Sequence, residues 1–123
     1  MKTSVVTGGA SGIGLELSKL LIKDNYKVYI VDNNVKNLQK LKTFLNPTSY
    51  EGINEDMSLV SSPKKIYNKL KDKNIEVLIN NAGFGDFGKF HKSEWKKGKK
   101  MINLHVLNTT HLTKLFLKDM VKK

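Results

Sequence analysis

The sequence predicts an α/β fold of three layers, in which helices cover both faces of a doubly wound parallel sheet. Strand and helix patterns alternate from the first residues onward, which is typical of βαβ units. Residues 27–32, KVYIVD, are mostly apolar, as expected of a strand covered on both faces. A glycine-rich turn joins the first strand to the first helix. We expect residues 1–123 to form one domain, because this length suffices for a single modest core.

The first half of the chain predicts two strands, each followed by a helix. The first strand contains Val5 and Val6 and ends at Thr7. Apolar residues at helical spacing predict the buried face of the first helix, which comprises Ile13, Leu17, Leu20 and Leu21. After the strand at 27–32, a second helix is expected from the spacing of Val35, Leu38, Leu41 and Leu45. It should end near Asn46, because the proline that follows disfavours helix before it.

The second half predicts two more strands, at 48–53 and 76–79, on either side of a third helix. Ser62 is expected to be the N-cap of that helix, because Pro63 suits the first helical position. Its apolar face consists of Ile66, Tyr67 and Leu70. Ser93 is expected to cap the next helical segment, and residues 101–121 to form a long helix that is apolar around most of its circumference. Such a helix requires burial on more than one side.

Composition narrows the classes of partner. The formal net charge is +11, and every basic residue is a lysine. Arginine is the preferred residue for bidentate contacts to phosphates and bases, so its absence disfavours specific nucleic-acid recognition. There is no apolar run of membrane-spanning length and no signal-peptide pattern, so we expect a cytoplasmic protein without a membrane partner. The chain lacks cysteine and its three histidines do not share a helix face, so no metal site is expected.

The turn after the first strand has the composition of a phosphate-binding loop. It reads Thr7-Gly8-Gly9-Ala10-Ser11-Gly12-Ile13-Gly14 and opens a helix, whose first N–H groups and partial positive charge suit a pyrophosphate. Glycine permits positive φ and close approach of a phosphate to the backbone. The candidate binding residues in this turn are Thr7, Gly8, Ser11, Gly12, Ile13 and Gly14. The loop lacks the Gly-Lys-Ser/Thr ending of a nucleotide-triphosphate site.

A carboxylate ends the second predicted strand at the position expected for ribose binding. Asp32 follows Gly14 at close to the ~20 residues typical of dinucleotide sites. It would accept hydrogen bonds from both ribose hydroxyls of NAD and repel the 2′-phosphate of NADP. Asn33 is a further candidate, and Lys36 is the nearest positive charge. NAD is therefore the expected cofactor, with NADP less favoured.

These segments together resemble the short-chain dehydrogenases/reductases. The run at 7–14 matches that family's cofactor signature, and Asp56-Met57 resembles its pair at the adenine edge. Asn80-Asn81-Ala82-Gly83 is similar to its NNAG motif, so the resemblance implies that Asn80, Ala82 and Gly83 border the cofactor. Asn103 matches the asparagine that holds a water in the family's proton relay, which is its implied catalytic role. The implied fold is the first half of a Rossmann-type sheet with strand order 3-2-1-4, truncated after the fourth strand and the following helix.

The family's catalytic serine and Tyr-x-x-x-Lys pair are expected to lie beyond residue 123, and we expect none of the four tyrosines to begin that pattern or to replace the pair. The expected function is an NAD(P)-dependent oxidoreductase of the alcohol/ketone class, in a truncated form that is inactive alone. The alternatives are a non-enzymatic NAD-binding module, one part of a split enzyme, and a lysine-rich nucleic-acid-associated protein. Self-association or a complementing C-terminal half is the expected protein partner.

Overall fold

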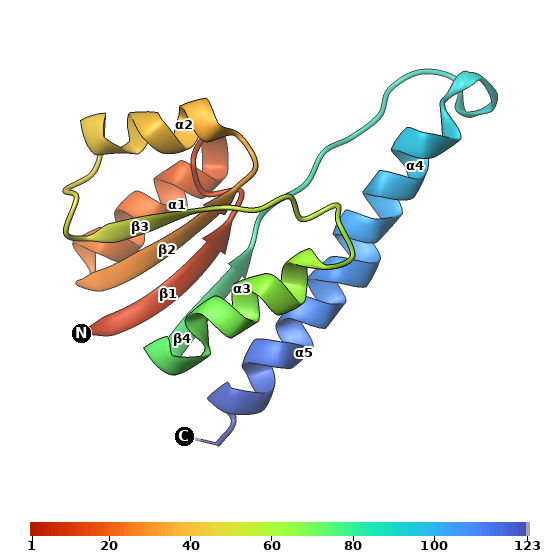
Figure 1. The fold of residues 1–123 in the computed structure, drawn as a ribbon. Helices are drawn as coiled ribbons and strands as arrows, with labels where there is room; N and C mark the ends of the chain where they lie inside the picture. Colours follow the sequence, from red (N-terminus) through yellow and green to blue (C-terminus); the bar gives the residue numbers. More distant parts are fainter. Residues whose placement is uncertain (123) are drawn as a thin grey trace.

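The computed structural model describes residues 1–122, one residue short of the predicted domain, and it is built around a four-stranded parallel sheet (Figure 1). The strands are β1 (Lys2–Thr7), β2 (Tyr26–Asp32), β3 (Tyr50–Asn54) and β4 (Ile75–Asn80). Their order in the sheet is β3-β2-β1-β4, and every neighbouring pair is parallel. The predicted fold class and strand order are confirmed.

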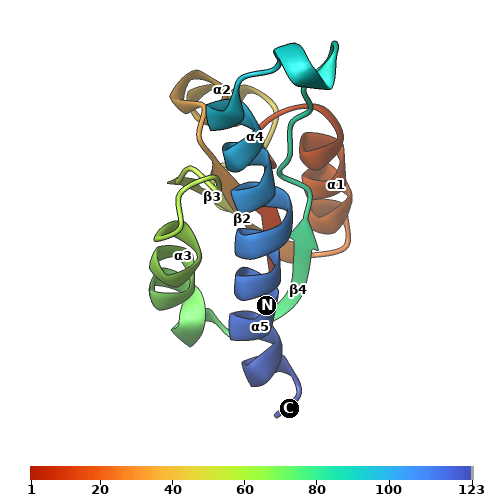
Figure 2. The same cartoon turned by 90° about the vertical axis from the view of Figure 1, so that its right-hand side faces the viewer.

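Helices cover the two faces of this sheet (Figures 1 and 2). One face carries α1 (Gly12–Lys23) and α2 (Val35–Lys40), and the other carries α3 (Ser62–Leu70) and α5 (Thr109–Met120). The remaining helix, α4 (Trp95–Ile102), continues the line of α5 past the carboxyl ends of the strands.

The hydrophobic core is divided by the sheet into two clusters. Val5 and Val6 are consecutive residues of β1, so their side chains point to opposite faces. Val5 belongs to the cluster that contains residues of α3 and α5, whereas Val6 belongs to the cluster under α1 and α2. Residues 28–31 of β2 are all buried, which confirms the prediction of a strand covered on both faces.

The predicted buried face of α1 is confirmed only in part, because Leu21 packs against the core and Leu17 is half-buried, whereas the other two residues are exposed. Ile13 and Leu20 are 74% and 58% exposed, and the buried positions are instead Gly14, Leu15 and Ser18. Two of these three have small side chains, and the Ser18 hydroxyl donates to the carbonyl of Gly14 within the helix. Small residues let the helix approach the sheet closely. They are not strongly hydrophobic, so the spacing of apolar residues does not identify them as buried.

The starts and ends of α2 and α3 also differ from the prediction. The helix at Val35 is followed from Leu41 by a single 3₁₀ turn that ends at Thr43, short of the expected Asn46. Ser61, and not Ser62, is the N-cap of α3. Ser62 is the first helical residue, and its buried hydroxyl donates to the carbonyl of Asp56.

The predicted helix 101–121 proves to be the second part of a longer helical rod. The rod begins at Trp95, so Ser93 does not cap it, and the Ser93 hydroxyl donates to the carbonyl of Phe90. Between α4 and α5 the backbone forms a π-helical segment, Asn103–Asn108. Such segments inside α-helices are frequently found at functional sites.

Among residues 1–122, only one side of this rod is buried, although the apolar pattern of residues 101–121 led us to expect burial on more than one side. Leu104, Leu112 and Phe116 are buried against the rest of the domain. The opposite surface presents exposed apolar side chains, namely Ile102, Val106, Leu107, Leu117 and Val121. Trp95, at the start of the rod, is 70% exposed. Within residues 1–122, no helix is long and apolar enough to cross a membrane.

Candidate functional site

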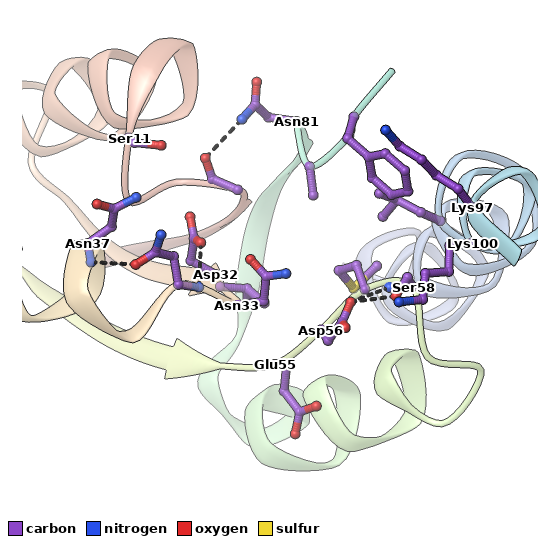
Figure 3. A pocket seen from close by; sticks show the side chains of 18 of the residues that line it. Ser11, Asp32, Asn33, Asn37, Glu55, Asp56, Ser58, Asn81, Lys97 and Lys100 are labelled. Carbon is purple, nitrogen blue, oxygen red and sulfur yellow. Dashed lines mark hydrogen bonds between the residues drawn. The ribbon is translucent and has the colours of Figure 1, made fainter. Parts of the chain in front are cut away.

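A cleft of about 900 Å³ lies at the carboxyl ends of the strands (Figure 3). The connection after β1 covers one face of the sheet and the connection before β4 covers the other, so the chain changes face between these two neighbouring strands. In open α/β sheets, ligands bind at such a switch point. The cleft is lined by the glycine loop, the ends of β2 and β3, the segment after β4, and α4.

The glycine loop crosses the base of the cleft, and its glycines have different roles. Gly8 and Gly12 adopt positive φ angles of 64° and 54°, which other residues rarely adopt. A Cβ on Gly14 would lie 2.1 Å from the carbonyl oxygen of Gly8, so the start of α1 packs against the loop itself. A Cβ on Gly12 would meet nothing within 4 Å, so the backbone there is open to a ligand.

The start of α1 is prepared for an anion. The N-cap Ser11 makes no side-chain capping bond, and the first turn contains no acidic residue. The first N–H groups of a helix have no partner within the helix and carry a partial positive charge. Ser11 and Ile13 are exposed and line the cleft on either side of Gly12.

Thr7 fastens β1 to the segment that follows β4. Its hydroxyl oxygen accepts hydrogen bonds from the backbone N–H groups of Asn81, at 3.1 Å, and Ala82, at 3.0 Å. The Asn81 side chain in turn donates to the carbonyl of Gly8 at 3.0 Å. Thr7 itself is buried, so it shapes the cleft from below and does not line it.

Asp32 lines the cleft at the end of β2 and holds two backbone segments (Figure 3). One carboxylate oxygen accepts from the N–H of Ala10 at 3.1 Å, and the other accepts from the N–H of Asn34 at 3.0 Å. Each carboxylate oxygen can accept a further hydrogen bond. Asn33 and Asn37 flank Asp32 along the same wall.

The loop between β3 and α3 forms the next wall of the cleft. One Asp56 carboxylate oxygen accepts from both the N–H of Ser58, at 2.9 Å, and its hydroxyl, at 2.7 Å. The Met57 side chain is buried in the core cluster beside α5, although the residue also borders the cleft. The loop therefore has a fixed conformation and presents Asp56 at the cleft surface.

The structure brings most of the predicted binding residues together in one place. Those that line the cleft are Gly8, Ser11, Ile13, Asp32, Asn33, Asp56, Met57, Ala82 and Gly83. The other three predicted residues of the glycine loop, Thr7, Gly12 and Gly14, do not line the cleft. Asn80 does not line the cleft either, and its side chain donates to the hydroxyl of Thr113 on α5. Asn81 takes the place at the cleft that we expected for Asn80, because alternate residues leaving a strand point in opposite directions.

The proposed catalytic Asn103 lies outside the cleft lining. It is the first residue of the π-helical segment and half-buried, and its neighbour Leu104 lines the cleft. Sequence reasoning also missed three lysines of α4 that border the cleft, Lys96, Lys97 and Lys100. Lys97 and Lys100 lie across the cleft from Asp32 (Figure 3). Lys97 forms an ion pair with Asp86 at 3.2 Å.

The expectation about tyrosines requires a correction. Tyr67 is followed by Lys71 at the Tyr-x-x-x-Lys spacing, so the chain does contain that pattern once. The Tyr67 hydroxyl donates to the carboxylate of Asp119 on α5, away from the cleft. This bond, followed by burial, raises the pKa of Tyr67 above its ordinary value. A catalytic tyrosine of the family has its pKa lowered by the lysine, so Tyr67 does not fit that role.

The family model described as short chain dehydrogenase matches residues 2–123. The chain belongs to the short-chain dehydrogenase family. It is 30% identical over 116 residues to a Helicobacter pylori protein named a probable short-chain type dehydrogenase/reductase, VdlC. The aligned region covers 93% of this chain and 41% of VdlC. Against the curated relatives that it matches, the chain spans about half of their length or less.

Solved short-chain dehydrogenases share the fold. An alcohol dehydrogenase from Comamonas testosteroni, described as specific for bulky-bulky ketones, superposes with a TM-score of 0.90 at 21% identity, covering 99% of this chain and 50% of that one. The L-sorbose reductase of Gluconobacter frateurii, solved with NADPH and L-sorbose, superposes with a TM-score of 0.86 at 21% identity, covering 97% and 47%. The family binds a nicotinamide dinucleotide, and these two likenesses show that this chain shares the family's fold.

Proposed function

We propose that this chain is the cofactor-binding part of an oxidoreductase that prefers NAD to NADP and acts on an alcohol or ketone. The observation that carries the proposal is the cleft itself, in which a glycine loop, an uncapped helix start and a strand-end carboxylate meet. Since the chain spans about half the length of its relatives, the activity of the whole protein is part of the proposal.

The glycine loop and the start of α1 fit a pyrophosphate. Gly12 leaves open space where a side chain would stand, and the neighbouring N–H groups at the start of α1 are donors for phosphate oxygens. Ser11 adds a hydroxyl at the rim of the cleft. The sheet below, fastened by Thr7 and Asn81, keeps these donors in place before a ligand arrives.

Asp32 supports the preference for NAD. Its two oxygens are already oriented by backbone N–H groups, so they can receive ribose hydroxyls without rearranging. A 2′-phosphate in that place would bring two negative charges together, which is unfavourable. The lysines that border the cleft come from α4, and Lys97 and Lys100 lie across the cleft from Asp32.

The remaining residues fit the rest of the dinucleotide. Asp56 and Met57 would border the adenine, and Ala82 and Gly83 the ribose beside it, since all four line the cleft. When bound, the nicotinamide ring supplies hydride exchange with a carbon that carries oxygen. The chain's own residues bind and orient the cofactor, and Asn103 would take part in the proton relay from its place beside Leu104.

Titration calorimetry with NAD and NADP tests this function. We expect saturable binding of NAD, weaker binding of NADP, and little change in NAD affinity between 50 and 200 mM salt. Titration with duplex DNA is the control for the charge of +11, because electrostatic DNA binding collapses over about that range of salt. Absence of saturable NAD binding by a folded chain would exclude the proposal.

A further inference from the structure

The π-helical segment between α4 and α5 sends side chains to two separate walls of the cleft. His105 lies against the segment after β4, where its Nε2 is 2.9 Å from the carbonyl oxygen of Phe84. Asn108, at the other end of the segment, reaches the loop between β3 and α3. Neither His105 nor Asn108 lines the cleft, so neither is placed to contact a ligand there.

Asn108 is fully buried, at 0% exposure, and its amide nitrogen serves two acceptors. It donates to the carbonyl of Met57 and, at 2.8 Å, to the carbonyl of Leu59. Leu59 also accepts from the N–H of Ser62 at 3.0 Å. For the carbonyl of Met57, Asn108 is the one hydrogen-bond donor found among residues 1–122. The amide therefore fixes the backbone of this loop on both sides of Ser58.

The carbonyl oxygen of the Asn108 side chain has no hydrogen-bond partner among residues 1–122. A buried polar atom without a partner lowers the stability of a fold. Leucine has similar size and would fill the same space without that loss. The asparagine is thus explained by its two donated bonds and not by core packing.

We infer that Asn108 is a positioning residue for the adenine of the cofactor, acting through the loop that carries Asp56 and Ser58. Asp56 and Ser58 line the cleft, and the Ser58 hydroxyl and N–H orient the Asp56 carboxylate. With Met57 and Leu59 tied to the rod, that carboxylate is held toward the exocyclic amino group of adenine, a donor that it can accept from. This inference rests on the proposed function.

The ratio of affinities for two cofactors tests it. Nicotinamide hypoxanthine dinucleotide has the phosphates and riboses of NAD but an oxygen in place of the adenine amino group. We expect the unmodified chain to bind NAD about tenfold more tightly, which corresponds to the net strength of one hydrogen bond. We expect Asn108→Leu to bring the ratio close to one. A ratio is insensitive to the folded fraction, so a general loss of stability would leave it unchanged.

Phe116→Leu is the matched control, since Phe116 is buried on the same rod, about two turns further along α5, and has no hydrogen bond to the loop. Its ratio should stay at the unmodified value. If Asn108→Leu does not fold, Asn108→Ser provides the test, because its shorter hydroxyl retains at most one donated bond, and an intermediate ratio is expected. An unchanged ratio in the folded variant overturns the inference, as does an unmodified chain that binds both dinucleotides equally. An unmodified chain that binds neither refutes the proposed function instead.

Discussion

At the scale of single residues, Asp32 combines a structural and a binding task. Its carboxylate joins the glycine loop to the end of β2 through the N–H groups of Ala10 and Asn34. A substitution that removes the whole carboxylate would therefore disturb the loop as well as the ribose site. Asparagine removes the charge and keeps the size of the side chain, and its one oxygen can still accept from one of the two N–H groups.

We predict that Asp32→Asn reduces the preference for NAD over NADP by about tenfold, the free energy of one charge-assisted contact. The charge that repels a 2′-phosphate is lost, whereas an oxygen acceptor remains. Calorimetric titration with both cofactors measures the change. Asp24→Asn removes the same charge at the far end of α1 and should leave the preference unaltered. Equal affinity for both cofactors before any substitution would contradict the role of Asp32.

Two glycines of the loop should respond differently to the same added methyl group. In Gly14→Ala the new carbon would lie 2.1 Å from the backbone oxygen of Gly8, so we expect a loss of stability of ~1 to 3 kcal/mol or more. In Gly12→Ala the methyl meets nothing within 4 Å beyond its own stretch of chain, so we expect mainly weaker NAD binding, together with ~1 kcal/mol of strain from its positive φ.

Urea unfolding and calorimetry on each glycine variant separate these effects. Gly98→Ala is the control, because Gly98 lies within α4 and its added carbon comes no closer than 3.8 Å to another residue. It should retain NAD binding and gain some helix stability. If Gly12→Ala binds NAD as tightly as the unmodified chain, the open space at Gly12 is not where the phosphates lie.

At the scale of secondary structure, α3 and α5 are joined by the bond from the Tyr67 hydroxyl to Asp119. This bond, and then burial, raises the pKa of Tyr67 in the folded chain. A raised pKa contributes stability that is fully present below the unfolded pKa of tyrosine, about 10, and is lost as pH rises through the folded value.

We therefore predict that Tyr67→Phe lowers stability at pH 7 to 9 and that the difference from the unmodified chain shrinks above pH 10. Thermal unfolding across this range measures the difference. Asp119→Asn should move the absorbance titration of one tyrosine back toward its ordinary pKa. Tyr26→Phe is the control, because Tyr26 has no such partner among residues 1–122. A pH-independent difference would show that the hydroxyl is not held by the carboxylate.

The alternation of strands and helices was predictable because burial imposes a period of two or 3.6 on the apolar residues. The face of α1 was predictable only in part, since its contact with the sheet includes Gly14 and Ser18, which carry little hydrophobic signal. The positions of Asp32 and the glycine loop followed from motif spacing. The choice between Asn80 and Asn81, and the reach of Asn108 to Met57, depend on where a backbone turns in three dimensions.

At the scale of the whole molecule, two surfaces are suited to association with another protein. Among residues 1–122, β4 pairs with β1 on one side and forms the edge of the sheet on the other. The outer surface of the rod carries the exposed apolar side chains Ile102, Val106, Leu107, Leu117 and Val121. Exposed strand edges and apolar patches both favour self-association.

We predict that the chain self-associates and that Leu117→Glu shifts it toward the monomer. Sedimentation velocity at several protein and salt concentrations measures the distribution, because the charge of +11 opposes association at low salt. Leu20→Glu is the matched control: both leucines are about half exposed, but Leu20 lies on α1, which covers the other face of the sheet. A folded monomer at high protein and salt concentrations would contradict this prediction.

The parallel arrangement of the strands has a practical consequence for attaching the protein to a surface. All four strands begin at one end of the sheet and finish at the cleft, and Met1 is 91% exposed at the end where they begin (Figure 1). A biotin or affinity tag joined to Met1 therefore anchors the molecule with its cleft directed away from the support. Immobilisation through lysines would instead modify Lys96 and Lys100 at the cleft rim and obstruct the measurement.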